Sequence, residues 1–264
     1  MVFPALFRAA LGRIAGVTIA AAALFATAPA AQAEFKLRYP VIDFHEVEFE
    51  HNGDVTFDKP NSGKSNDQSY TNEVGIGFLP NWFVELEGEW AAPPGENLRY
   101  DATTLENTFQ LMPQGKYWLD LGFFAEYSHA ASRSDADSVT FGPLVQKELP
   151  DIFGFDTLHT LNVLFSKQIG HNRKDATPLL LAWQSRLRLD PLFEPGFELY
   201  SNLNDIEAPG KLAEQQHRIG PMFAGVYLIP HYGKLKYEAG YLFGLTRATE
   251  KGAVRWRLEY EVPF

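Results

Sequence analysis

Apolar and polar residues alternate along most of the chain after residue 40, in stretches of about ten residues. A period of two is typical of a β-strand whose two faces meet different surroundings. The pattern is clearest at the end of the chain, where one face carries Val254, Trp256, Leu258, Tyr260, Val262 and Phe264 and the other carries Arg255, Arg257, Glu259, Glu261 and Pro263. The last strand therefore has an apolar face that continues to the final residue.

The same alternation predicts eleven earlier strands. Their approximate limits are residues 41–51, 69–79, 82–91, 99–111, 116–128, 138–149, 157–169, 178–189, 196–204, 215–228 and 234–245. The pattern is weaker in the first, fourth and tenth of them, where polar residues, Gly or Pro interrupt the apolar face. With the last strand they predict an all-β protein of about twelve strands.

The connections between these strands alternate in length. Short ones fall at 80–81, 112–115, 150–156, 190–195 and 229–233, and longer or more polar ones fall at 52–68, 92–98, 129–137, 170–177, 205–214 and 246–251. Short turns at one end and longer loops at the other, around an even number of antiparallel strands, are typical of outer-membrane barrels. A soluble β-sandwich, the alternative for a chain of this length, has no reason to sort its loops in this way.

The final strand resembles the C-terminal signature strand of bacterial outer-membrane β-barrels, which ends in Phe or Trp after alternating apolar residues. Here Phe264 holds that position. The resemblance implies a transmembrane antiparallel up-and-down β-barrel, surrounded by outer-membrane lipid and lipopolysaccharide. It also implies that the barrel assembly machinery is a partner that reads this strand. A sandwich would instead bury Trp256 and Tyr260 between two sheets.

The first 33 residues have the pattern of a secretory signal peptide. Arg8 and Arg13 lie in a stretch without acids, an apolar run covers 14–26, and the small residues end in Ala31-Gln32-Ala33. The apolar run is shorter than the roughly 20 residues that a spanning helix needs. We therefore expect a signal peptide at 1–33, a barrel domain at 34–264 that starts on the periplasmic side, and a location in the cell outer membrane.

Composition excludes several kinds of function. The chain has no cysteine, which excludes disulfides, thiolate metal sites and the lipid anchor of a lipoprotein. Loss of the two leader arginines leaves 23 − 2 = 21 basic against 33 acidic residues, a net charge of 21 − 33 = −12, and this disfavours nucleic acid as a partner. No two histidines have the i, i+4 spacing of a metal pair, so we expect no metal and no cofactor.

In such a barrel the charged positions point into the lumen. The predicted first five strands contribute mainly glutamates, and strands eight to twelve contribute most of the bases. Glu85 follows the turn at Asn81 and Arg186 precedes the turn at Asp190 by the same distance, so the two should lie at similar height across the lumen. The residues expected to set selectivity are Glu46, Glu48, Glu50, Glu85, Glu87, Glu89, Arg186, Arg188, Arg255 and Arg257. We also expect the last strand to close on the first through opposite charges.

The favoured function is a porin-like channel for small polar solutes, because twelve strands lie between the filled eight-stranded and the open sixteen-stranded barrels. Inward glycines should leave room; they are Gly75, Gly77, Gly122, Gly142, Gly240 and Gly244. The alternative is a structural or binding barrel whose opposing acids and bases fill the lumen. In that case the 52–68 loop would meet the outside, although Asp54, Asp58 and Asp67 in it do not have the spacing of a calcium loop.

A lipid-modifying enzyme is the other alternative. Outer-membrane lipid hydrolases place Ser and His on the outer face of the barrel, near the external rim. The candidates here are Ser128, His129, Ser132, Ser166 and His171. A serine nucleophile needs a base within hydrogen-bond reach, and no spacing among these residues indicates one. We therefore expect no enzyme activity.

Overall fold

The computed structural model describes residues 35–60, 62–152 and 154–264. The predicted signal peptide, residues 1–33, lies outside this range, so its cleavage stays a prediction. The described residues form the strands β1 (Glu46–Phe57), β2 (Gln68–Leu79), β3 (Trp82–Ala92), β4 (Arg99–Gln110), β5 (Asp120–Ala130), β6 (Asp137–Ile152), β7 (Phe155–Ile169), β8 (Leu179–Leu187), β9 (Glu194–Asn202), β10 (Gln216–Ile229), β11 (Gly233–Gly244) and β12 (Gly252–Pro263), with a short 3-10 helix, η1 (Leu212–Glu214), before β10. No helix in the described part of the chain is long and apolar enough to cross a membrane.

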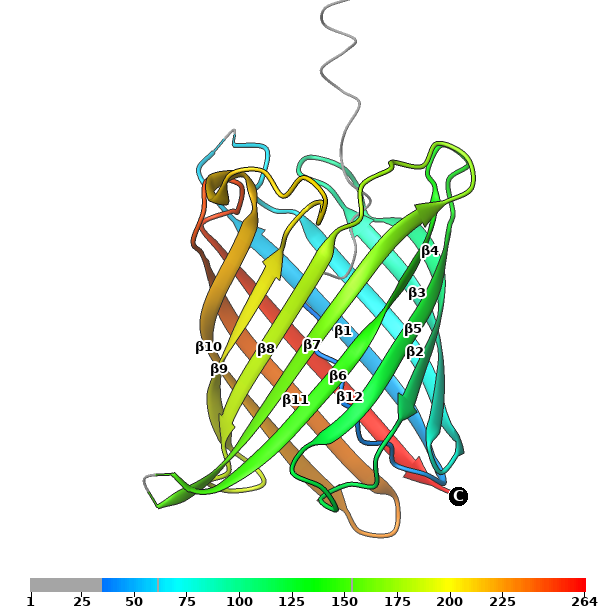
Figure 1. The fold of residues 1–264 in the computed structure, drawn as a ribbon, viewed down its shortest axis with the longest axis vertical. Coiled ribbons are helices and arrows are strands. Elements are labelled where there is room, and N and C mark those ends of the chain that lie inside the picture. The colour runs from blue at the N-terminus through cyan, green and yellow to red at the C-terminus, as the bar shows by residue number, and fades with distance from the viewer. Residues whose placement is uncertain (1–34, 61, 153) are drawn as a thin grey trace, which may run out of the picture. The chain divides into compact units, whose positions relative to one another are not determined.

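The strands form a closed antiparallel barrel (Figure 1), which confirms the predicted fold. Each strand pairs with its neighbours in sequence, and β12 pairs with β1. The connections 58–67, 93–98, 131–136, 170–178, 203–215 and 245–251 meet at one end, which we call the loop end. The connections 80–81, 111–119, 188–193 and 230–232 and the tight link between β6 and β7 meet at the other, which we call the turn end. Most of them are shorter than the loop-end connections, and 111–119 is the exception. Closure matters because an unpaired backbone group in hydrocarbon costs several kcal/mol.

The barrel is apolar outside and charged inside. On β3, Glu85, Glu87 and Glu89 are buried, while Leu86 between them is 58% exposed. Each strand except β8 presents such an apolar residue to the outside: Phe49, Val74, Leu86, Leu105, Phe123, Phe141, Leu161, Phe197, Phe223, Tyr241 and Leu258. This reversal of the usual arrangement suits a wall that faces lipid, and it excludes a soluble sandwich with an apolar interior.

Aromatic side chains lie near both ends of β3, as the sequence indicates. Trp82 stacks on Phe109 of β4, and Trp90 packs edge-on against Tyr100. Tyr117 lies outside the fifth strand. It lies in the 111–119 connection, because β5 begins at Asp120 and the prediction of a strand from 116 was too early.

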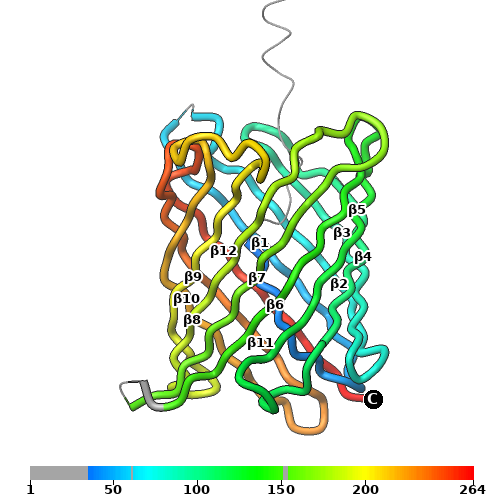
Figure 2. Tube along the Cα trace, viewed as in Figure 1, coloured from blue at the N-terminus to red at the C-terminus, as the bar shows by residue number. Residues whose placement is uncertain are grey.

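The first strand also differs from the prediction, and the difference matters for function. The sequence placed it at 41–51, but β1 spans Glu46–Phe57. Residues 35–45, which we call the inner segment, precede it and run inside the barrel from its middle to the turn end (Figure 2, dark blue). The described residues therefore begin within the lumen, while β1 itself begins at the turn end, the end at which the sequence predicts the first strand to start.

The last strand pairs with the first, as predicted. Its register, however, places two glutamates of β12 directly across from glutamates of β1. Glu48 lies opposite Glu261 and Glu50 lies opposite Glu259. Arg257 lies opposite Asn52 and reaches diagonally to Glu50. Like charges face each other directly here, so a base from outside the pair is needed to compensate them.

Candidate functional site in the barrel lumen

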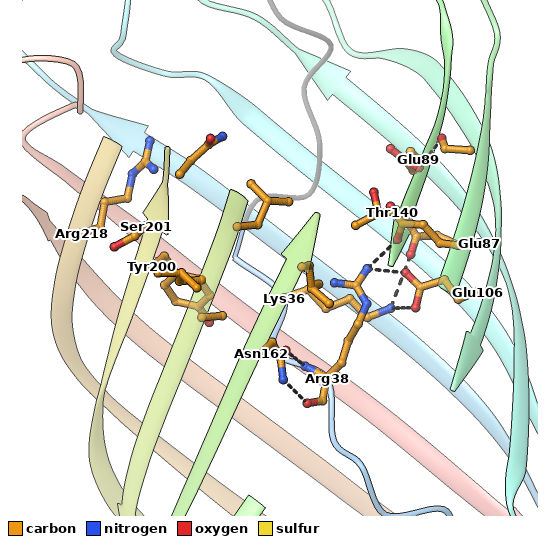
Figure 3. Close-up of a pocket in the computed structure, with 17 residues that line it drawn as sticks. Lys36, Arg38, Glu87, Glu89, Glu106, Thr140, Asn162, Tyr200, Ser201 and Arg218 are labelled. Atoms are coloured by element: carbon orange, nitrogen blue, oxygen red, sulfur yellow. Dashed lines mark hydrogen bonds and ion pairs between the residues drawn. The ribbon is translucent and has the colours of Figure 1, made fainter. Parts of the chain in front are cut away.

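The inner segment is an extended strip with two different sides. The side chains of Phe35, Leu37 and Tyr39 lie on one side, and those of Lys36 and Arg38 lie on the other. Figure 3 shows Lys36 and Arg38 directed at the glutamates of the barrel wall. The alternation is the same two-residue period that builds the strands, used here for a segment that the barrel surrounds.

Lys36 lies in a cluster of buried carboxylates. Its ammonium Nζ is 3.0 Å from Glu106, 3.5 Å from Glu87 and 3.8 Å from Glu50, and it also contacts Glu73. The Lys36 side chain is only 3% exposed. A buried charge is stable only when it is paired and hydrogen-bonded, so this lysine and the four glutamates depend on one another.

Arg38 extends the same contact toward β5. Its guanidinium Nη2 lies 2.5 Å from Glu106 and 3.0 Å from Glu126. The guanidinium carbon also lies 4.1 Å from the centre of the Phe124 ring, which is a cation–π geometry. The two bases of the inner segment therefore supply positive charge to the wall from β1 to β5, where the strands themselves carry almost none.

The other side of the inner segment packs on the opposite wall. Phe35 and Leu37 are buried in a cluster with Tyr200 of β9 and Leu242 of β11, and Tyr39 packs against it. The Phe35 and Tyr200 rings meet edge to face, with centroids 5.4 Å apart. Burial of such side chains contributes about 1.5–3 kcal/mol each, so the segment is held by apolar contact as well as by charge.

Hydrogen bonds to the backbone fix the segment in place. The backbone N–H of Arg38 donates to Asn162 Oδ1 at 2.7 Å, and Asn162 Nδ2 donates to the Arg38 carbonyl at 2.8 Å. Tyr200 donates to the Phe35 carbonyl at 3.2 Å, and Arg257 donates to the Leu37 carbonyl at 3.1 Å. An extended segment has no hydrogen bonds of its own, so these bonds replace water for a buried backbone.

Near the turn end the segment fits against two inward glycines. A Cβ on Gly122 would lie 2.9 Å from Pro40 Cα, and one on Gly77 would lie 2.6 Å from the carbonyl oxygen of Asp43. The expectation that inward glycines leave open space was therefore wrong for these two, because the inner segment occupies it.

Burial favours protonation of Asp43, but hydrogen bonds from Lys234 and the charge of Lys236 lower its pKa below the ordinary value.

Two cavities remain on either side of Lys36 and Arg38, which line both. The loop-end cavity has a volume of about 80 Å³ and is also lined by Glu89, Glu126 and Arg218. The turn-end cavity is larger, about 370 Å³, and carries both acidic and basic side chains. Lys36 and Arg38 therefore lie between a cavity toward the loop end and a cavity toward the turn end.

The structure places the predicted glutamates on the wall that faces the inner segment or the turn-end cavity. Glu50 and Glu87 contact Lys36, and Glu48 lies 3.9 Å from Arg257. Glu89 lies nearer the loop end and accepts hydrogen bonds from Thr104 and Ser128. Glu46 pairs with Lys234 at 3.1 Å, at the turn end. Glu85 lines the turn-end cavity.

Most of the predicted arginines form ion pairs with acids outside β1–β3. Arg186 and Arg188 both bind Glu194 on the adjacent strand β9, at 3.4 and 3.1 Å. Arg255 binds Glu198 and Glu238. Among the predicted arginines, Arg257 alone reaches Glu50 in the part of the chain that the structure describes. Arg186 and Arg188 therefore form no direct ion pair with the glutamates of β1–β3, although Glu85 and Arg186 line the same turn-end cavity, together with Lys36 and Arg38.

The serine and histidine candidates for a lipid hydrolase have other partners. Ser128 donates to Glu89 in the lumen, and His129 pairs with Asp137 at 2.9 Å. Ser132 bonds to Ser134, and Ser166 accepts from Thr140. His171 lies exposed in the 170–178 loop.

Two Ser–His contacts that the sequence spacing did not indicate are formed across neighbouring strands. Ser185 Oγ lies 2.7 Å from His159 Nδ1, and Ser201 Oγ lies 2.9 Å from His217 Nδ1. Both pairs join residues that are directly opposite in the register, one between β7 and β8 and one between β9 and β10. Such pairs are visible only once the register is known.

Comparison with known proteins supports the fold. No protein-family model matches the sequence, and no curated protein sequence matches it. An outer-membrane channel from Pseudomonas putida F1 has a similar structure, with a TM-score of 0.53 and 11% identity over 90% of this chain and 100% of that one. A KdgM porin in complex with disordered oligogalacturonate gives 0.48 and 10%, over 83% and 99% of the two chains. The translocator domain of the autotransporter NalP from Neisseria meningitidis gives 0.46 and 12%, over 83% and 88%.

The chain therefore has the fold of an outer-membrane β-barrel. Its closed twelve-stranded wall, its apolar exterior and its likeness to the Pseudomonas channel agree on this class. At this level of identity the likeness concerns the fold, so function has to be argued from the lumen.

Proposed function

We propose that this protein is an outer-membrane channel for small polar solutes, and that the inner segment is its constriction. The observation that carries the proposal is the position of Lys36 and Arg38 between two polar cavities that they both line. A polar lumen inside a lipid-facing wall favours polar solutes over apolar ones. The charged side chains on both sides of the constriction would set which solutes pass.

The excess of carboxylates near the constriction supports a preference for cations. Four glutamates share Lys36, and Glu106 and Glu126 share Arg38. Rings of acidic side chains in a narrow passage concentrate cations and repel anions. We expect reversal potentials measured across a KCl gradient to show cation selectivity, and selectivity to rise when Lys36 and Arg38 are both replaced by alanine.

Single-channel recording in planar bilayers tests the proposal. The wild-type protein should show small, discrete conductance steps, and a variant that lacks residues 35–44 should show larger steps because the constriction is gone. A plugged barrel would be silent as wild type and conduct only after the deletion. If both proteins are folded, as judged by heat-dependent electrophoretic mobility, and both are silent, the channel function is wrong.

We also propose that the barrel assembly machinery reads β12 in the cell and delivers the protein to the outer membrane. Phe264 is exposed at the end of that strand, and its N–H donates to the carbonyl of His45. Removal of Phe264 should reduce the amount of folded protein in isolated outer membranes. Refolding of the same variant into detergent micelles should be little affected, because no assembly factor takes part there.

One observation favours a second candidate function, hydrolysis of lipid esters. The register places Ser201 opposite His217, and the His217 Nε2 lies 3.0 Å from Gln215 Oε1. With a proton on Nε2 donated to that amide oxygen, Nδ1 accepts from the Ser201 hydroxyl, as a general base does for a serine nucleophile. Strand alternation places Ser201 and His217 on the opposite faces of their strands from Tyr200 and Arg218, although Ser201 is only 9% exposed and also borders the loop-end cavity.

An esterase assay on protein folded in micelles tests this second function. The S201A variant should lose activity, and the S185A variant should keep it, since Ser185 belongs to the other Ser–His pair at the turn end. Equal activity of the two variants, or none in the wild type, would exclude Ser201 as a nucleophile.

A further inference from the structure

Three glutamates converge in the turn-end half of the lumen. Glu48 of β1 pairs with Gly75 of β2, and Gly75 pairs with Glu85 of β3, so the two glutamates lie in one row on either side of a glycine. A side chain on Gly75 would collide with Phe83 and Glu85, at 2.6 and 2.8 Å from its Cβ. The glycine therefore leaves the space in which the two carboxylates approach each other.

Carboxylate oxygens of Glu48, Glu50 and Glu85, which we call the glutamate trio, all lie within 4.8 Å of one another. All three residues are buried. Like charges at this separation repel strongly in a medium of low polarity, so three ionised carboxylates need positive charge close by.

The bases around the trio do not supply enough positive charge. Arg257 contacts Glu50 and Glu259, and it reaches Glu48 only at 3.9 Å. Lys36 lies 3.8 Å from Glu50, but three further glutamates outside the trio share it. Glu85 is 8% exposed, and among the described residues it has neither a hydrogen bond nor an ion pair within 4 Å. An unpaired buried carboxylate of this kind costs several kcal/mol unless a ligand satisfies it.

The turn-end cavity gives a ligand access to the trio. Glu48 and Glu85 both line this space of about 370 Å³. A water molecule occupies about 30 Å³ of liquid volume, so the space also holds water ligands for an ion. Carboxylate and water oxygens are the donors that hard divalent cations prefer.

We propose that the glutamate trio binds a divalent metal cation, and that Ca²⁺ fits it better than Mg²⁺. Ca²⁺ accepts an irregular set of carboxylate and water oxygens, whereas Mg²⁺ demands near-ideal octahedral geometry and gives up its water ligands reluctantly. The three oxygens lie within 4.8 Å of one another, close enough for one ion to contact all of them. The site is a property of the folded barrel and does not depend on whether the lumen conducts.

Calorimetric titration of CaCl2 into the wild-type barrel in detergent micelles tests the site. We expect one site per chain with a dissociation constant of about 0.1–1 mM, the range of extracellular calcium modules. E85Q should weaken binding by more than about tenfold, because a charged ligand is lost. E89Q is the matched control: Glu89 is on the same face of β3 but bonds to Thr104 and Ser128, so this variant should bind normally.

Thermal unfolding is a second test, in which the melting temperatures of E85Q and the wild type are compared without and with Ca²⁺. Without Ca²⁺, E85Q should melt above the wild type, because an unpaired buried charge is removed. Added Ca²⁺ should raise the melting temperature of the wild type and leave that of E85Q unchanged, since only the wild type gains from binding. If E85Q does not fold, E48Q takes its place with the same expectations.

Three results would overturn the proposal. One is the absence of both heat and a melting shift in the wild type at about 10 mM Ca²⁺, well above the expected range. Another is Ca²⁺ binding that E85Q and E48Q leave unchanged. The third, Mg²⁺ binding as tight as that of Ca²⁺, would refute the preference for Ca²⁺.

Discussion

Replacement of Lys36 by alanine removes the cation that four buried glutamates share. Two of them keep another base, since Glu106 retains Arg38 and Glu50 retains Arg257. Glu73 and Glu87 have no other basic group within ion-pair distance in the described part of the chain. K36A therefore leaves two buried carboxylates without a counter-charge, which is more harmful than the loss of a surface contact.

Removal of one partner from a buried ion pair costs about 3–5 kcal/mol, so K36A should lower the free energy of unfolding by roughly that amount. The loss should be smaller at acidic pH, because protonation removes the unpaired charge. K36M keeps an apolar stem but should lose a similar amount of unfolding free energy, because the positive charge of Lys36, and not its packing, stabilises the glutamates.

Urea unfolding in micelles, followed by tryptophan fluorescence, measures the effect. R99A is the control: Arg99 pairs with Glu96 at 2.5 Å, but both side chains are more than half exposed, and such pairs contribute about 0–1 kcal/mol. A K36A protein within about 0.5 kcal/mol of the wild type would refute the reasoning, because it would show that the glutamates do not need the lysine.

Four further predictions follow from the inner segment and the leader. G122V should displace the segment, because a Cβ there meets Pro40 at 2.9 Å, and should enlarge single-channel conductance. Y200F should cost about 0.5–1.5 kcal/mol in urea unfolding through the lost hydrogen bond to the segment backbone. The lowered pKa of Asp43 contributes stability above its unfolded value of about 3.9, and this is lost as pH falls through the folded value. D43N should therefore be less stable than the wild type at neutral pH and equal to it in strong acid. Mass spectrometry of the exported protein should find Glu34 as the first residue, and a retained leader would contradict the signal peptide.

The charge of the first five strands indicates that positive charge must come from another part of the chain, which the strand pattern does not reveal. The first five strands carry many glutamates and almost no base, so a source of positive charge was missing. Residues Phe35-Lys36-Leu37-Arg38-Tyr39 alternate like a strand and hold two bases. This stretch is too short to stand out as a strand of its own, and no local feature shows that it lies inside the barrel and not in its wall.

The sequence by itself determined that there are twelve strands and, for most of them, which side chains face inward. These follow from local rules, since a wall between lipid and a polar interior imposes a period of two on every strand. The tertiary structure decided which charges meet. Lys36 reaches Glu106 across 70 residues of sequence, and Arg186 turns to Glu194 on the next strand. Such contacts depend on the register of the strands, on their tilt and on the segment inside the lumen. The spacing of residues along one strand determines none of these.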